Sequence, residues 1–139
     1  MTTYEFVNMH AMAKNLQSIR DETRFQDFVT DIASIPYDIG FLTETWRKDR
    51  EEIICMPKGG TPYLSGGMLH RGVGISFSKK FEKHLDRESF QSIFPRFCTV
   101  DFSFKCQDFR AFAVCFPTAW DADEAVDELY DLVELLLWW

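Results

Sequence analysis

The sequence predicts an α/β domain with a mixed, largely antiparallel sheet flanked by helices. Apolar residues recur at helical spacing from residue 23 and again from residue 121. Between these stretches, several short segments alternate apolar and small or polar residues with the period of two that is typical of strands. The order of strand, helix, strand, a run of antiparallel strands and a second helix indicates a mixed sheet.

The length and composition predict one globular domain, or part of one, over residues 1–139. The chain is 46% hydrophobic and 27% charged, which lies in the globular range. A chain of 139 residues is long enough to bury about two-thirds of its unfolded surface. The sequence has no internal repeat and no stretch with the composition of a linker.

The charge and the cysteines exclude several classes of protein. A formal net charge of -7 argues against non-specific electrostatic binding of the whole chain to nucleic acid. The four cysteines have no C-x-x-C spacing, so we expect buried free thiols and neither zinc nor disulfides. Because the sequence has no signal-like leader and no apolar run of about 20 residues, we expect no membrane association and a nuclear or cytoplasmic location.

The N-terminal part contains a weak strand and a clear helix. Residues 4–8 favour a short strand that ends at Asn8. Thr23 and Gln26 fit a capping box at the start of the helix. Phe25, Phe28, Val29 and Ile32 form its apolar stripe, and we expect it to end before Pro36.

The middle of the chain contains two predicted strands around a long loop. Residues 38–42 form an apolar run typical of a strand that is buried on both faces. Residues 46–60 are charged and then rich in Pro and Gly, which indicates a long surface loop with at most a weak edge strand, for which residues 63–65 are candidates. Residues 72–78 alternate as a strand does, and Lys79 and Lys80 end it.

The C-terminal part predicts a hairpin followed by a helix. Strands at residues 97–104 and 109–116 are joined by a turn at residues 105–108, and Pro117 closes the second strand. Asp121 and Glu124 offer a helix start, after which an apolar stripe continues to Trp138 and Trp139 without a glycine stop or a polar tail. We therefore expect this helix to continue, or to meet a partner, beyond these residues.

Four motifs in this order resemble the endonuclease/exonuclease/phosphatase superfamily, with its deoxyribonuclease-I-like fold. The nearest resemblance is to the endonuclease domain of the reverse transcriptases of non-LTR retrotransposons. The motifs are the strand that precedes Thr43-Glu44-Thr45-Trp46, the strand 72–78 with its two lysines, the hairpin that ends at Cys115-Phe116-Pro117, and the helix from Asp121. The resemblance implies a partial deoxyribonuclease-I-like α/β sandwich, as the N-terminal portion of an incomplete domain.

The resemblance also implies a chemistry, which is hydrolysis of a phosphodiester in DNA by a metal-activated water. Glu44 would be a ligand of Mg²⁺ or Mn²⁺, and Asn8, as the counterpart of the family's first-strand Asn, would orient the metal site. Two alternatives remain open: Glu44 as a solvated carboxylate that begins a polar loop, and Asn8 as an ordinary turn residue. The substrate class, whether DNA, RNA or a small phosphoester, is not fixed by the fold.

Several departures from the family pattern reduce the expected activity. Cys115 stands where the family has its active-site Tyr, and we expect a buried thiol there. Neither the Gly-Asp-Phe-Asn segment nor the Ser-Asp-His segment occurs in these residues. We expect His10, His70 and His84 to be surface residues, and the charged stretches around Arg47 and Lys79 to be solvated faces.

Three functions remain after these observations. The first is an endonuclease portion of retroelement origin that has weak or no activity alone. The second is an active nuclease whose C-terminal half comes from the native product or from a second chain, which would cover exposed apolar surface. The third is an acidic protein-interaction module that uses an exposed sheet edge and an aromatic surface.

Overall fold

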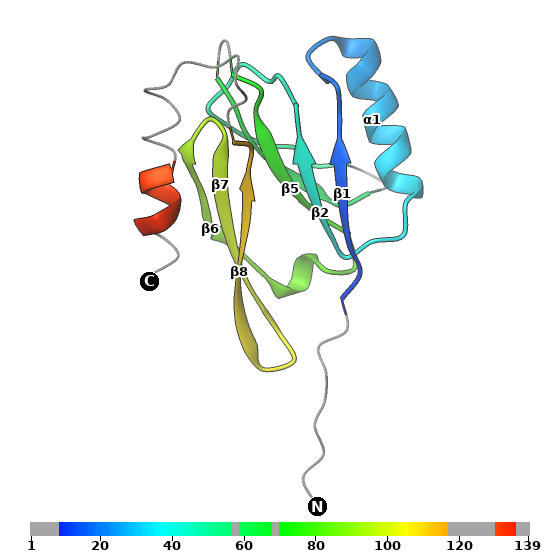
Figure 1. The fold of residues 1–139 in the computed structure, drawn as a ribbon. Coiled ribbons are helices and arrows are strands. Elements are labelled where there is room, and N and C mark those ends of the chain that lie inside the picture. Colours follow the sequence, from blue (N-terminus) through cyan, green and yellow to red (C-terminus); the bar gives the residue numbers. More distant parts are fainter. Residues whose placement is uncertain (1–8, 57–58, 68–69, 117–129, 136–139) are drawn as a thin grey trace, which may run out of the picture.

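The computed structural model describes residues 9–56, 59–67, 70–116 and 130–135. Two β-sheets lie face to face, and one long helix covers the outer face of the larger sheet (Figure 1). The elements are β1 (Ala11–Asn15), α1 (Glu22–Ser34), β2 (Ile39–Thr43), β3 (Glu51–Ile53), β4 (Thr61–Ser65), β5 (Val73–Phe77), the 3-10 turn η1 (Glu82–His84), β6 (Leu85–Phe94), β7 (Phe97–Phe104) and β8 (Gln107–Val114).

The larger sheet has the order β1-β2-β5-β4-β3 and is mixed, as the sequence predicts. β1 and β2 are parallel, with Asn15 opposite Thr43, and the remaining pairs are antiparallel. The parallel pair requires a crossover, which α1 provides. The expected buried strand at residues 38–42 is confirmed as β2, shifted by one residue.

The smaller sheet is an antiparallel meander in the order β6-β7-β8. The β7–β8 hairpin turns through Lys105 and Cys106, whose φ angles are both positive, at 49° and 62°. Two positive φ angles match the tight primed turns that join twisted strands. The predicted four-residue turn is therefore wrong: two residues suffice, and β8 begins and ends two residues earlier than expected.

Two hydrophobic clusters form the core, one on each face of the larger sheet. Between the sheets, the ring centroid of Tyr63 on the larger sheet lies 5.3 Å from that of Phe90 on the smaller one, and the centroid of Phe77 lies 6.0 Å from that of Phe102. On the opposite face, α1 contributes buried residues that pack with Leu42 and Leu64. From β1 to β8, the described residues therefore form three layers: the helix α1, a mixed sheet and a smaller antiparallel sheet.

Helix α1 begins at a different cap from the one expected. Asp21 is the N-cap, and its Oδ1 accepts a hydrogen bond from Arg24 N at 2.9 Å. The predicted capping box at Thr23 is therefore wrong, and Gln26 instead donates to Glu22 at 2.9 Å within the helix. The apolar stripe is confirmed, since Phe28 and Ile32 are buried, and the helix ends before Pro36.

Three further points concern the predicted and observed strands. β4 is buried between β5 and β3, so the predicted edge at residues 63–65 is wrong and β3 is the edge. The sequence did not predict β6, whose ten residues are mostly polar and whose pairing with β7 shifts register twice. The expected strand at residues 4–8 lies outside the described residues, and the first described strand is β1.

The last predicted helix is described only in part. Residues 130–135 are helical, and Tyr130 stacks on Phe116 with ring centroids 4.7 Å apart. The remainder of that prediction lies outside the described residues. Within the described part of the chain, no helix has the length and apolarity needed to cross a membrane.

Candidate functional site

The carboxyl ends of three strands lie at the same end of the molecule. β1, β2 and β8 all run upward in Figure 1, and β2 and β8 are in contact. Glu44 follows β2 directly, Cys115 follows β8, and Asn15 is the last residue of β1. Open α/β sheets commonly bind ligands at the carboxyl ends of their strands. This end, which we call the strand-end site, is therefore the candidate.

The backbone around Glu44 has an unusual conformation. Glu44 and Trp46 both have positive φ angles, of 55° and 53°, although neither is a glycine. Between them, Thr45 is completely buried. Left-handed conformations at non-glycine residues cost free energy and are enriched at functional sites. This conformation places the Glu44 side chain at the strand end, where about a quarter of its surface is exposed.

The segment after β1 is tied to the segment after β2 by the main chain. Leu16 N donates to Thr43 O at 2.9 Å, and Ser18 N donates to Glu44 O at 2.8 Å. Gln17 and Ser18 also have positive φ angles, of 51° and 80°. The two strand ends therefore form one hydrogen-bonded unit that fixes Asn15 and Glu44 relative to each other.

Asn15 is a further candidate residue at this end, which the sequence prediction did not name. It is exposed, lies opposite Thr43 in the parallel register, and its Oδ1 accepts from Gln17 N at 3.0 Å. Asn8, the residue predicted for this role, lies outside the described residues and precedes β1. The missed signal was the Asn15-Leu16-Gln17-Ser18 stretch, which is polar at its first, third and fourth positions, as expected where a strand ends.

The loop between β4 and β5 packs against Glu44. Trp46 N donates to Arg71 O at 2.8 Å, and the Arg71 Nη1 lies 3.6 Å from Glu44 Oε1. Gly72 has a φ of +75°, and a Cβ at this position would lie 2.2 Å from Thr45 Oγ1. Only glycine therefore allows this close approach. The Glu44 carboxylate is therefore ion-paired as well as partly exposed to solvent.

The β6–β7 turn and the end of β8 complete this end of the molecule. The His70 ring lies edge-on to Phe94, with centroids 5.6 Å apart, and Cys115 N donates to Arg96 O at 2.9 Å. Cys115 is half-buried and packs on the core between the sheets, close to the buried thiol that we expected. Of the histidines expected at the surface, His10 is exposed, whereas His70 and His84 are half-buried.

The described residues supply only part of a metal site. No three His, Cys, Asp or Glu side chains gather closely enough to hold a metal ion in the described ranges. At the strand-end site, Glu44 offers one carboxylate and Asn15 one amide oxygen, both hard ligands suited to Mg²⁺. Because Mg²⁺ retains several waters, one or two such ligands can take part in a site, but Arg71 lies against the carboxylate.

Two arginines expected on a solvated loop hold the framework together. Arg47 makes a bidentate pair with Glu52, at 2.9 and 3.0 Å, and lies 4.9 Å from the Phe25 ring. Arg50 donates to Ser92 Oγ, Ser92 O and Ile93 O at 2.7 to 3.2 Å. Arg50 thus connects the start of β3 to β6 in the other sheet. The basic residues Lys79, Lys80 and Lys83 are exposed, as expected.

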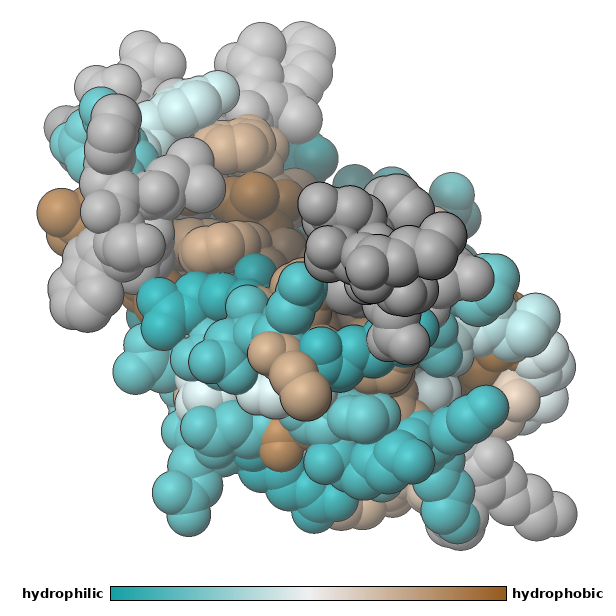
Figure 2. Space-filling view, turned by 90° about the horizontal axis from the view of Figure 1, so that it is seen from below, coloured by the Kyte–Doolittle hydropathy of each residue, from teal (hydrophilic) through white to brown (hydrophobic). Residues whose placement is uncertain are grey.

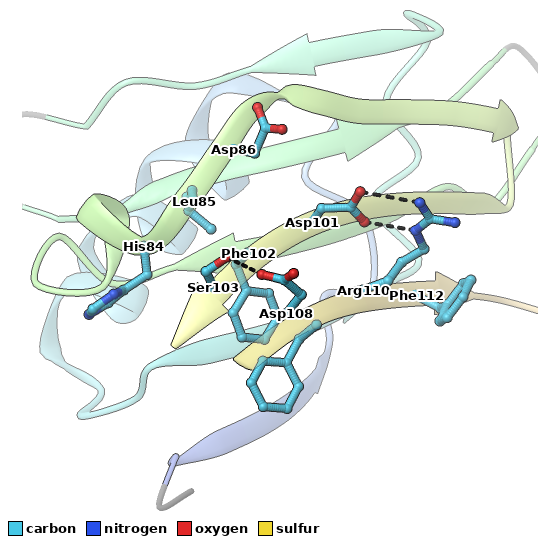
Figure 3. Close-up of a pocket in the computed structure, with 10 residues that line it drawn as sticks. His84, Leu85, Asp86, Asp101, Phe102, Ser103, Asp108, Arg110 and Phe112 are labelled. Atoms are coloured by element: carbon cyan, nitrogen blue, oxygen red, sulfur yellow. Dashed lines mark hydrogen bonds and ion pairs between the residues drawn. The ribbon is translucent and has the colours of Figure 1, made fainter. Parts of the chain in front are cut away.

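A groove with a volume of about 700 Å³ lies elsewhere, on the smaller sheet. Four of its polar side chains form two pairs (Figure 3): Arg110 binds Asp101 at 2.7 and 3.2 Å, and Ser103 donates to Asp108 at 2.6 Å. Asp86 stands apart from them in Figure 3. Because no charged groups converge on one point, we do not regard the groove as a catalytic site.

The four cysteines are free thiols that differ in how deeply they are buried. Cys98 is completely buried, and burial raises the pKa of its thiol to about 12. Cys55 and Cys106 are exposed, so the expectation of buried thiols is wrong for these two. Cys106 is exposed because it lies in the hairpin turn. A raised pKa makes Cys98 a poor nucleophile, which agrees with a structural role.

Comparison with known proteins adds no assignment, because no family model matches the chain and no curated protein is significantly similar to it.

Proposed function

We propose that this chain supplies the glutamate-bearing part of a metal-dependent phosphodiesterase that cuts DNA, with a deoxyribonuclease-I-like sandwich and a retroelement origin. The observation that carries the proposal is the position of Glu44, held in a left-handed conformation directly after β2 at the strand-end site. The two facing sheets and the helix on the outer face of the larger sheet are compatible with that fold. The four motifs in sequence order support the family.

Each residue of the site has a distinct role in this proposal. Glu44 would hold Mg²⁺ or Mn²⁺ together with oxygen ligands from beyond the described residues, and Asn15 would orient the bound phosphate or the metal's water shell. The bound ion would stabilise charge that develops on the phosphate oxygens. The buried Thr45 and the left-handed Trp46 keep the Glu44 backbone in place.

Little turnover is expected from these 139 residues alone. The sequence contains no counterpart of the segments that supply the catalytic Asp and the activating His, so no assigned group takes the proton from water. Loss of one member of a cooperating catalytic set usually costs several powers of ten in rate. We therefore expect weak or undetectable nicking.

The test is Mg²⁺-dependent nicking of supercoiled plasmid by the wild-type chain and by Glu44→Gln, with EDTA as the metal-free control. Glu52→Gln is a matched variant, because it also removes a half-buried carboxylate that is paired with an arginine. Any nicking should be slow, should require the metal and should disappear in Glu44→Gln but persist in Glu52→Gln. Rapid nicking, or nicking that survives Glu44→Gln, would contradict the proposal.

A second candidate function is a protein-interaction module. Apolar side chains remain exposed at Ile53 on the edge strand β3, and at the stacked pair Phe116 and Tyr130. Seen from the end opposite the strand-end site, the surface is largely hydrophilic, with a hydrophobic strip beside the atoms drawn in grey (Figure 2). Light scattering tests this candidate, since self-association would favour it and a monomer would disfavour it.

A further inference from the structure

The strand-end site already contains a positive charge that belongs to the protein. The Arg71 guanidinium lies 3.6 Å from the Glu44 carboxylate, and the two side chains are exposed by 25% and 26% respectively. Groups this far buried retain a larger electrostatic interaction than a pair in open solvent, because water screens them less. Arg71 therefore balances the carboxylate in the absence of any metal.

The position of Arg71 is fixed by its backbone. Its carbonyl oxygen accepts a hydrogen bond from Trp46 N at 2.8 Å, and the next residue, Gly72, has a φ of +75° and lies against Thr45. Both contacts join the β4–β5 loop to the residues that flank Glu44. The backbone therefore holds Arg71 beside Glu44, from where its guanidinium reaches the carboxylate.

We propose that Arg71 is the resident cation of the Glu44 site and that a divalent metal must compete with it for the carboxylate. This inference rests on the proposed function, because it concerns the same metal ligand. Mg²⁺ and Mn²⁺ bind carboxylate oxygen at about 2 Å, so a guanidinium this close to the same group repels the incoming ion. Arg71 thus lowers the metal affinity of the site.

The experiment measures Mn²⁺ binding by electron paramagnetic resonance, using MnCl₂ with the wild-type chain, Arg71→Gln, Arg71→Lys and Glu44→Gln. Removal of the charge in Arg71→Gln should tighten Mn²⁺ binding about tenfold, which is the order expected for one charge at a partly exposed site. Arg71→Lys keeps the charge and should bind close to the wild-type level. Glu44→Gln should lose the site, both in the wild-type chain and when it is combined with Arg71→Gln.

A matched control is Arg110→Gln, since Arg110 is also ion-paired, with Asp101 on the other sheet. It should leave Mn²⁺ affinity unchanged, and circular dichroism should show the same fold for every variant. The inference is overturned if Arg71→Gln binds Mn²⁺ no more tightly than the wild type. If the wild type binds Mn²⁺ at Glu44 but Arg71→Gln binds it no more tightly, only this inference fails. If Glu44→Gln removes no Mn²⁺ binding from the wild type or from Arg71→Gln, the proposed function fails as well.

Discussion

Two buried tyrosines, one on β4 and one just before β2, should respond in opposite ways to loss of the hydroxyl group. Tyr63, on β4, is completely buried among aromatic rings, and no hydrogen-bond partner for its Oη is found among the described residues. Tyr37 is also buried, but its Oη lies 2.7 Å from the buried Ser76 Oγ. Substitution of each by phenylalanine removes one oxygen atom and leaves the ring in place.

The expected magnitudes follow from the two hydrogen-bonding states. A buried, unsatisfied polar group costs about 1–3 kcal/mol, so Tyr63→Phe should raise the free energy of unfolding, by roughly 1 kcal/mol after the small void is counted. Tyr37→Phe loses a hydrogen bond and leaves Ser76 without this partner, so it should lower that free energy by about 1–3 kcal/mol. The two variants should differ by at least about 2 kcal/mol.

The assay is urea denaturation at neutral pH, followed by circular dichroism. An unchanged m-value with a shifted midpoint would show that stability alone has changed. A loss of more than about 1 kcal/mol in Tyr63→Phe would refute the reasoning, because it would mean that the Tyr63 hydroxyl has a partner in the folded protein. Equal effects of the two substitutions would refute it as well.

Three further predictions concern the framework of the site. Burial raises the pKa of the Cys98 thiol from 9.0 to about 12, so the folded state holds the thiol proton more tightly than the unfolded state. The contribution of this group to the free energy of unfolding is therefore complete below pH 9 and is lost between pH 9 and 12. Denaturation midpoints from pH 8 to 10 should therefore fall less steeply in Cys98→Ala. Gly72→Ala should cost about 2–4 kcal/mol in urea denaturation, because its positive φ and the Thr45 contact both resist a Cβ, whereas Gly67→Ala should cost clearly less. Arg50→Ala should cost about 1–2 kcal/mol through its lost bonds to β6, more than Arg110→Ala, whose pair is exposed; equal losses would contradict the role of Arg50 in joining the sheets.

The elements with strong local patterns were predictable from the sequence. Helix α1 and strands β2, β5 and β7 each have a hydrophobic period that matches their burial, so their positions agree with the prediction to within about two residues. Strand β6 has no such period, because it lies at a sheet edge with its polar residues in solvent and its pairing interrupted by register shifts. Its place in the fold comes from pairing with β7, which a local pattern does not reveal.

The candidate site was predictable only at one residue. Glu44 follows a strongly apolar strand, so its place at a strand end could be read from the sequence, whereas β1 is short and has the alternating exposure of an edge strand. This weak pattern does not single out Asn15, and the prediction of Asn8 lies outside the described residues. The ion pair with Arg71 joins residues 27 positions apart and depends on the left-handed Glu44 and on Gly72. No sequence spacing indicates that contact.

The most direct test of the central claim, that Glu44 is a metal ligand, is a Mn²⁺ titration followed by two-dimensional ¹H–¹⁵N NMR. Bound Mn²⁺ broadens signals of nearby amides, so substoichiometric MnCl₂ should first broaden those of residues 15–18, 43–46 and 70–72, and Glu44→Gln should abolish this effect. Broadening that is spread over exposed carboxylates elsewhere, or that is unchanged in Glu44→Gln, would contradict the account.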